Sequence, residues 1–286
     1  GEVTLGGGHV TFRGSLTDDG ILDGSAQMEA VDVSAFLPNP TPEVPFAGRL
    51  DGTLVLQGTF ATPRARARLT SSRLFLGDEG IGALEARLVG SGDGRLRVDG
   101  TVRSGRVDLG VTGSVETLPP YEAALQLEAR DTSIDPFVRA MEPALPSTIG
   151  LVASGKMRLE GPLGRPGDIR AEARVPELRL SLPDYPIRSR DAVRLGLEGG
   201  RLRLADFHLA GEGTDLIVTG SADLLGDGPL SVSAQGQADL RALTFVTRRL
   251  RGAGAARLAL EVTGTRSDPR LQGTLDKLRA ITTGTR

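Results

Sequence analysis

The sequence predicts an all-β protein whose strands form antiparallel hairpins. Apolar and polar residues alternate in most stretches, as at positions 95–99 (Arg-Leu-Arg-Val-Asp), which is the period of a strand with one covered and one solvent-facing side. The 39 glycines and 17 prolines are scattered without a period of three, so chain reversals are frequent and long helices few. Aromatic residues make up only 3% of the chain and none is Trp, so leucine, valine and alanine are expected on the covered side.

Three segments that read Gly, four residues, Pro indicate an internal repeat. They occupy residues 58–63, 161–166 and 264–269, and successive glycines are 103 residues apart (161 − 58 and 264 − 161). Each follows an alternating apolar stretch, so we expect modules of about a hundred residues, each with such a segment at its first hairpin. The predicted boundaries are the end of a module at 1–47, full modules at 48–149 and 150–251, and the start of another at 252–286. The chain is interpreted as one continuous piece of a longer repetitive protein.

The first 47 residues predict short strands near Val3 and Val10, separated by three consecutive glycines at 6–8. Asp19-Gly20 and Asp23-Gly24 are both predicted to be hairpin turns, because this dipeptide suits the positive φ angles of a type I′ turn. Residues 31–37 end the segment, and the prolines at 38, 40, 42 and 45 mark a boundary because they cannot donate ladder hydrogen bonds.

The module at 48–149 predicts about seven short strands and a closing helix. The apolar positions of these strands fall at 54–56, 74–76, 84–88, 96–98, 107–111 and 125–127. Asp135 can cap a helix whose first position is Pro136 and which runs to about Met141.

The module at 150–251 repeats this plan. Its apolar pairs fall at 178 and 180, 195 and 197, 202 and 204, 216 and 218, and 230 and 232. A second short helix is predicted at 239–246, where Leu240, Leu243 and Val246 follow Asp239 at a three-residue spacing.

The composition gives little support to catalysis, metal binding or nucleic-acid binding. The 34 basic and 36 acidic residues are interspersed, with a net charge of −2, so neither a nucleic-acid footprint nor a polybasic membrane patch is expected. The absence of Cys excludes disulfides and thiolate ligands. His9 and His208 are far apart, and no carboxylate pair stands out, so we predict no enzyme activity, catalytic residue, metal site or cofactor. The glycine-rich segments 6–8 and 211–213 lack a Walker lysine and are interpreted as bends.

The covered side of the sheet must meet something apolar. One solution is a sandwich or barrel filled by the protein's own side chains, which general physical grounds favour because it is the commoner solution. The other is a trough whose apolar interior holds acyl chains.

Several stretches resemble the repeats of the TamB and AsmA-like family of Gram-negative envelope proteins. They are residues 48–58 followed by Pro63, residues 155–161 followed by Pro166, the two-strand run 195–211, and residues 218–224. The resemblance implies an elongated, curled, mainly antiparallel β-sheet that forms a U-shaped trough (a β-taco) with few short helices. It further implies a non-catalytic segment of a bridge that is anchored in the inner membrane, crosses the periplasm and carries phospholipid towards the outer membrane.

The partners that this resemblance implies are phospholipid acyl chains and neighbouring modules of the same long chain. A role in outer-membrane biogenesis through an outer-membrane barrel protein is also implied, but the anchoring helix and the C-terminal partner-binding segment of the family have no match here. The residues expected to line the groove are Leu54, Leu56, Leu96, Val98, Leu125, Leu127, Leu178, Leu180, Leu202, Leu204, Leu230 and Val232.

Two other interpretations remain open at the level of the sequence. One is a structural or adhesive all-β repeat, a solenoid or a string of sandwiches, that binds no lipid. The single Asn and the Asp-Gly turns favour hairpins over a parallel solenoid. The other is a glycan-active enzyme, which the lack of Trp and of a carboxylate pair disfavours.

Overall fold

The computed structural model describes residues 1–36, 46–59, 62–141, 147–182, 185–239, 254–265 and 267–277. The fold is all-β, as the alternating sequence pattern predicts, and every strand pairing given between described strands is antiparallel. The chain divides into two compact units. The first contains Gly1–Leu145 and Arg158–Pro166, and the second contains Pro146–Met157 and Gly167–Arg286.

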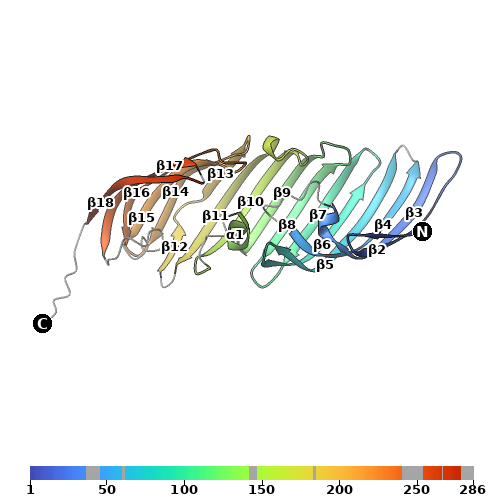
Figure 1. Ribbon diagram of the computed structural model, residues 1–286, viewed down its shortest axis with the longest axis horizontal. Coiled ribbons are helices and arrows are strands. Elements are labelled where there is room, and N and C mark those ends of the chain that lie inside the picture. Colours follow the sequence, from blue (N-terminus) through green and yellow to red (C-terminus); the bar gives the residue numbers. More distant parts are fainter. Residues whose placement is uncertain are drawn as a thin grey trace. The chain divides into compact units, whose positions relative to one another are not determined.

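In the first unit, nine strands pair with their neighbours in sequence order (Figure 1). Two short helices, η1 (Val33–Phe36) and α1 (Asp135–Met141), accompany this sheet. The strands are β1 (Glu2–Leu5), β2 (Gly8–Leu16), β3 (Ile21–Asp32), β4 (Phe46–Thr59), β5 (Pro63–Leu76), β6 (Glu79–Gly90), β7 (Arg95–Arg103), β8 (Asp108–Glu116) and β9 (Glu122–Ser133). Strand β10 (Gly150–Pro162) and the turn η2 (Pro166–Asp168) contain residues of both units.

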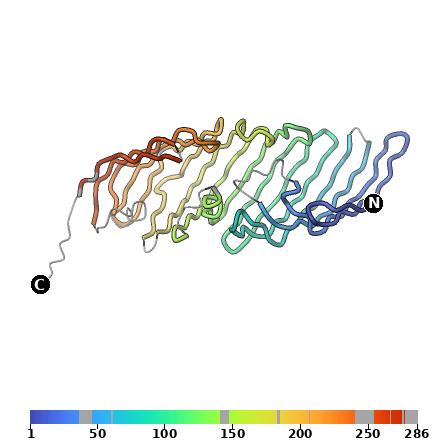
Figure 2. Tube along the Cα trace, in the orientation of Figure 1, coloured from blue at the N-terminus to red at the C-terminus, as the bar shows by residue number. Residues whose placement is uncertain are grey.

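The second unit has the same back-and-forth course, which the trace in Figure 2 follows along the chain. Its strands are β11 (Arg170–Leu182), β12 (Tyr185–Ser189), β13 (Val193–Glu198), β14 (Arg201–Gly211), β15 (Thr214–Asp223), β16 (Pro229–Asp239), β17 (Ala255–Thr265) and β18 (Pro269–Lys277). Strand β11 pairs with β13 through residues 171–175 and with β12 through residues 179–182, and both partners pair with β14. From β14 onward, each strand pairs with the next.

A sandwich would need a second sheet facing the first. Among the described residues of each unit, the paired strands belong to one sheet, so the sandwich that general grounds favoured is not found there. The sheet instead has two unlike sides. Along β4, for example, Leu50, Gly52, Leu54 and Leu56 are buried or half-buried, whereas the residues between them are exposed.

Of the two Asp-Gly dipeptides predicted as turns, one forms a turn and the other does not. Gly20 has a φ of 74° and lies in the turn between β2 and β3, where Thr17 donates its backbone N–H to Ile21 over 3.0 Å. The turn predicted at Asp23-Gly24 is wrong, because Gly24 lies inside β3, opposite Gly14 on one side and Leu56 on the other. A glycine on the covered side of a strand leaves room for a neighbour's side chain. Glycine therefore also occurs inside strands, and an Asp-Gly dipeptide does not always indicate a turn.

The three Gly-x4-Pro segments end strands with a glycine in the left-handed φ range. The φ angles are 109° at Gly58, 125° at Gly161 and 101° at Gly264. In two of the segments the glycine and the proline are cross-strand partners, Gly58 with Pro63 and Gly264 with Pro269, so the hairpins are equivalent. The middle segment differs, because its proline at position 166 begins the turn η2.

The strand predicted at residues 74–76 is longer than predicted. These residues form the end of β5, beyond a register shift between Ser71 and Leu74. The shift is a bulge, which changes the side to which the following side chains point and therefore interrupts the alternating pattern within one strand. The first part of β5, residues 63–71, was therefore not predicted as a strand, and the region from 46 to 133 contains six long strands, β4 to β9, where about seven short ones were predicted.

The helix predicted from Asp135 to Met141 is confirmed as α1. The helix predicted at 239–246 and the proline-rich stretch at 38–45 lie outside the described residues, apart from Asp239, which ends β16. The module boundaries at 47, 149 and 251 stay a prediction.

Candidate functional site

The side of each sheet that carries the groove-lining candidates is the candidate site. We call it the apolar face, and we call the opposite side, which carries the intervening residues, the open face. All twelve candidates are half-buried. Ten of them fall into rows that run across the strands, six in the first unit and four in the second.

In the first unit, three apolar rows cross eight neighbouring strands, from β2 to β9. None of their 24 positions holds a polar side chain, and from β3 to β9 every position is half-buried or buried. Row 1 contains Gly14, Gly24, Leu56, Ala65, Gly90, Leu96, Val115 and Ala123; row 2 contains Phe12, Ala26, Leu54, Ala67, Leu88, Val98, Gly113 and Leu125; row 3 contains Val10, Met28, Gly52, Leu69, Ala86, Gly100, Val111 and Leu127.

In the second unit, two apolar rows cross the strands in the same way. Row 4 contains Ala171, Leu197, Leu202, Ala222, Leu230 and Gly264; row 5 contains Ala173, Leu195, Leu204, Gly220, Val232, Val262 and Leu271. The remaining two candidates, Leu178 and Leu180, are not in these rows. They follow two exposed residues, Pro176 and Glu177, and Leu180 lies opposite Ile187 of β12.

Sequence reasoning selected leucines and valines and missed the alanines and glycines between them. Counting every second residue along each strand from a selected leucine or valine would have identified these small residues, because every second residue lies on the same side of the sheet. The alanines and glycines explain how the apolar face is half-covered without a second layer of helices or strands over it. A Cβ on Gly52 would lie 2.8 Å from Cδ2 of Leu69 and 2.9 Å from Cε of Met28, so the neighbours' side chains already occupy the space above the glycine.

Glycine also permits close approach of neighbouring strands. Gly113 in row 2 has a φ of 146°, and a Cβ there would lie 2.1 Å from the backbone oxygen of Ala124 on β9. Only a residue without a side chain fits this conformation and this distance. Gly236 on β16 is similar, with a φ of 137° and a Cβ position 2.1 Å from the oxygen of Asp215.

Helix α1 covers part of the apolar face in the first unit. Its Phe137 and Ala140 pack against a buried cluster at the ends of β5 and β6, formed by Leu74, Leu76 and Ile81. This packing gives the unit a small core beside strand ends, while rows 1 to 3 lie mostly half-buried.

Ion pairs hold α1 in place. The guanidinium of Arg139, whose side chain is 15% exposed, donates from Nε to Glu79 Oε1 at 2.8 Å and from Nη2 to Asp135 Oδ2 at 2.6 Å. Burial opposes the charge of Arg139, but the hydrogen bonds to Glu79 and Asp135 outweigh it and raise the pKa of the guanidinium above its ordinary value. Arg106 adds a contact to Glu79 at 3.1 Å.

The second unit has corresponding buried clusters. Tyr185 and Ile187 of β12 pack with Leu180, Leu182 and Leu209. The Tyr185 hydroxyl lies 2.7 Å from Oγ1 of Thr214, which accepts the backbone N–H of Asp239 at 3.0 Å. A further cluster joins Ala238, Ala256 and Leu258.

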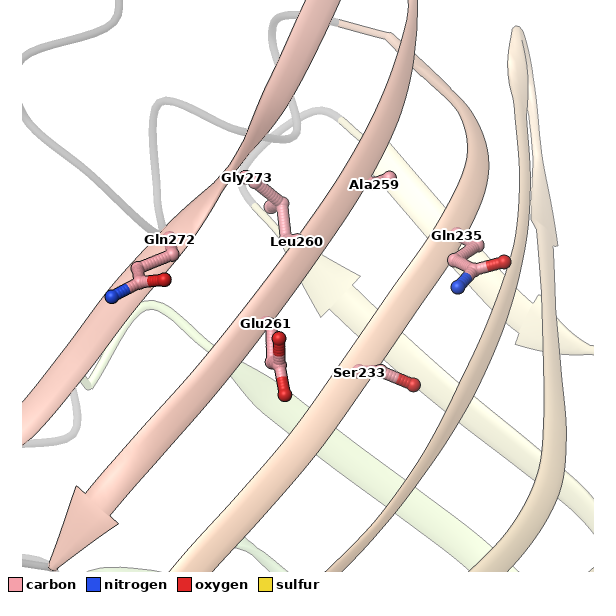
Figure 3. A pocket seen from close by; sticks show the side chains of 7 residues that line it. All are labelled: Ser233, Gln235, Ala259, Leu260, Glu261, Gln272 and Gly273. Carbon is pink, nitrogen blue, oxygen red and sulfur yellow. The ribbon is translucent and has the colours of Figure 1, made fainter.

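The open face of the second unit carries a polar hollow of about 450 Å³ between β16, β17 and β18 (Figure 3). Ser233, Gln235, Glu261 and Gln272 supply a hydroxyl, two amides and one carboxylate. These groups can hydrogen-bond a polar molecule, but a single carboxylate does not provide the acid and base pair that glycoside hydrolysis requires.

The two histidines lie apart, each beside one carboxylate. His9 Nδ1 is 3.5 Å from Glu2, and His208 Nδ1 is 3.2 Å from Asp191. No group of three or more potential metal-ligating residues is found among the described residues. In the same part of the chain, no helix has the length and apolar character needed to cross a membrane.

Comparison of this chain with protein-family models, curated proteins and solved structures gave no match. The candidate site is therefore interpreted from its own geometry.

Proposed function

We propose that the apolar face holds the acyl chains of phospholipids and that the chain is a middle segment of a periplasmic bridge, which carries lipid between the inner and outer membranes. The observation that carries the proposal is the unbroken apolar character of rows 1 to 5. The resemblance of the repeats to TamB and AsmA-like proteins supports the envelope setting, a role in outer-membrane biogenesis and the trough shape.

The rows have the properties that a sliding path needs. At about 4.8 Å per strand, the seven steps from β2 to β9 give a path of roughly 34 Å along the sheet. Transfer of an acyl chain from water to aliphatic contact contributes about 0.8 kcal/mol per CH2 group. Since leucine, valine, alanine and glycine recur along each row, neighbouring positions bind almost equally.

The alternative function is that of a structural or adhesive repeat without lipid binding. Leucine side chains of the apolar face lie over its glycines and cover part of the face. This is compatible with the alternative, because less apolar surface is then left for an external partner to cover. The two functions differ in whether phospholipid contacts the rows.

Photo-crosslinking at two adjacent residues separates them. A benzophenone amino acid replaces Leu88 of row 2 in one variant and Val89 of the open face in the other. The purified chain is irradiated with radiolabelled phospholipid, and lipid co-purified from cells is analysed in parallel. We expect lipid adducts at position 88 and few at position 89.

The pair is a stringent control because Val89 is also aliphatic and is 42% exposed. Labelling that followed exposure alone would favour position 89. Equal labelling at both positions, or none at position 88, would overturn the proposal. Leu204 and Arg203 provide the corresponding pair in the second unit, where Leu204 is half-buried and Arg203 exposed.

A further inference from the structure

Five exposed arginines gather on the open face of the first unit, on strands β5, β6 and β7. We call them the arginine patch, which consists of Arg64, Arg66, Arg68, Arg87 and Arg97. Arg66 and Arg97 lie on either side of Val89 in register, and Arg68 lies directly opposite Arg87. At sheet spacings of about 4.8 Å across strands and 6.8 Å along a strand, their charges occupy one continuous area.

The arginines of the patch form no ion pair with the described part of the chain. None of the five has an ion pair or side-chain hydrogen bond within the part of the chain that the structure describes, whereas other arginines of the unit do: Arg103 lies 3.5 Å from Asp108, and Arg130 lies 3.3 Å from Glu128. Carboxylates beside the patch include Asp99, which lies opposite Arg87, together with Glu85, Asp93 and Glu116. Since like charges placed directly opposite each other destabilise a sheet, the arrangement fits an anionic partner better than a role in folding.

The surroundings of the patch favour a lipid surface over other polyanions. Val55 and Val89 lie opposite Arg66 on its two sides and are 40% and 42% exposed, so apolar and basic groups are interleaved. None of the described residues beside the patch on the open face of β5 to β7 has an aromatic ring on which a single-stranded nucleic acid could stack its bases, and a guanidinium group matches phosphate geometry. Clusters of four to eight basic residues are of the size that binds anionic lipids.

A hollow of about 560 Å³ adjoins the patch at Arg97. Its wall includes the hydroxyls of Ser91, Thr112 and Ser114 as well as Asp93 and Arg95. These groups can hydrogen-bond the polar part of a phospholipid headgroup next to the arginines.

We propose that the arginine patch binds the surface of an anionic phospholipid membrane. The arginines contact headgroup phosphates, and the shorter side chains of Val55 and Val89 lie between the arginines, nearer the sheet. The patch is on the open face, so this contact is independent of acyl-chain binding on the apolar face.

Sedimentation of the purified chain with vesicles tests this inference. We expect binding to vesicles of phosphatidylcholine and phosphatidylglycerol but not to phosphatidylcholine alone. Salt raised from about 50 to 500 mM should release the chain, because the screening length shortens several-fold. Replacing Arg66, Arg68 and Arg87 together by Gln should weaken binding roughly 100-fold, given the usual contribution of each basic residue near such a surface.

The matched control replaces Arg103, Arg130 and Arg158 by Gln. It removes the same charge from the same unit, but these arginines are already paired, Arg158 with Glu160 at 2.6 Å, so we expect a change below about threefold. Replacing the three patch residues by Lys should keep most of the binding. Circular dichroism checks folding, and if the triple Gln variant does not fold, the three single Gln variants should each weaken binding about fivefold.

Three results would overturn the inference. The first is equal binding to phosphatidylcholine vesicles, which would indicate apolar insertion. The second is an equal loss in the control variant, which would indicate a general effect of net charge. The third is competition by a single-stranded oligonucleotide that the triple Gln variant abolishes, which would indicate a nucleic-acid partner. Lipid capture at position 88 should not change in the triple variant, so failure of this inference is distinguishable from failure of the lipid-path proposal.

Discussion

Two glycines of strand β8 should respond in opposite ways to the same substitution. Gly113 lies on the apolar face with a φ of 146°, whereas Gly110 lies on the open face with no neighbouring atom within 4 Å of its Cβ position. Replacing Gly113 by Ala forces a side chain into a conformation that costs about 1–3 kcal/mol. The Cβ would also lie 2.1 Å from the oxygen of Ala124, where ordinary contact begins at 3.4 Å, so β9 must move by about 1.3 Å.

This movement strains the ladder between β8 and β9, and each hydrogen bond lost costs about 0.5–1.5 kcal/mol. Gly113→Ala should therefore destabilise the protein by about 2–5 kcal/mol, which corresponds to a fall in melting temperature of roughly 5–15 °C. Gly110→Ala should be neutral or stabilising by up to about 1 kcal/mol, because it restricts only the unfolded chain. Thermal unfolding followed by circular dichroism measures both variants. Equal melting temperatures for wild type and Gly113→Ala, or an equal loss in Gly110→Ala, would refute the close approach of the two strands.

Three further predictions follow from single side chains. Leu88→Glu should destabilise the protein by about 1–3 kcal/mol because it places an unpaired carboxylate in row 2, whereas Val89→Glu should stay within about 0.5 kcal/mol of wild type in the same melts. Arg139→Met removes the contacts to Glu79 at 2.8 Å and to the buried Asp135 at 2.6 Å, while Arg106 still contacts Glu79, and it should cost about 3 kcal/mol, with faster hydrogen exchange of the α1 amides; unchanged exchange would contradict the role of these ion pairs. The side-chain and then the backbone hydrogen bond of Ser34 lower the pKa of Asp32 below 3.8, so its contribution to stability is fully present above that pH and is lost as the pH falls through the lowered value. The difference in unfolding free energy between wild type and Asp32→Asn should accordingly shrink below pH 3.8, and a difference that grew on acidification would contradict the sign.

Structural elements were predicted correctly from the sequence where a single physical rule determines them. Alternation identified the strands and the covered side, and Asp135 with Pro136 identified α1. Prediction from the sequence failed where a second structural constraint acted on the same residues. The bulge after Ser71 interrupts the alternation along β5, so only the end of this strand was predicted, and Gly24 lies on the covered side of β3 and does not form a turn.

The arginine patch could not be predicted from composition, because the chain as a whole is nearly neutral. The register decides which charges meet. It places Arg68 opposite Arg87, which is 19 positions away in the sequence, and it pairs Arg95 with Glu116 at a contact of 3.1 Å. Cross-strand register depends on bulges and turn lengths, so local patterning alone does not determine it.

The pairing of each strand with its predecessor also bears on how the chain reaches its fold. In the first unit every strand from β2 to β9 finds its partner in the strand made just before it, so the loops that must close are short and the entropy lost in closing them is small. Strands can therefore be added one after another as the chain leaves the ribosome, without waiting for distant segments. Each newly added strand is for a time an unpaired edge, and it is the next hairpin that protects it.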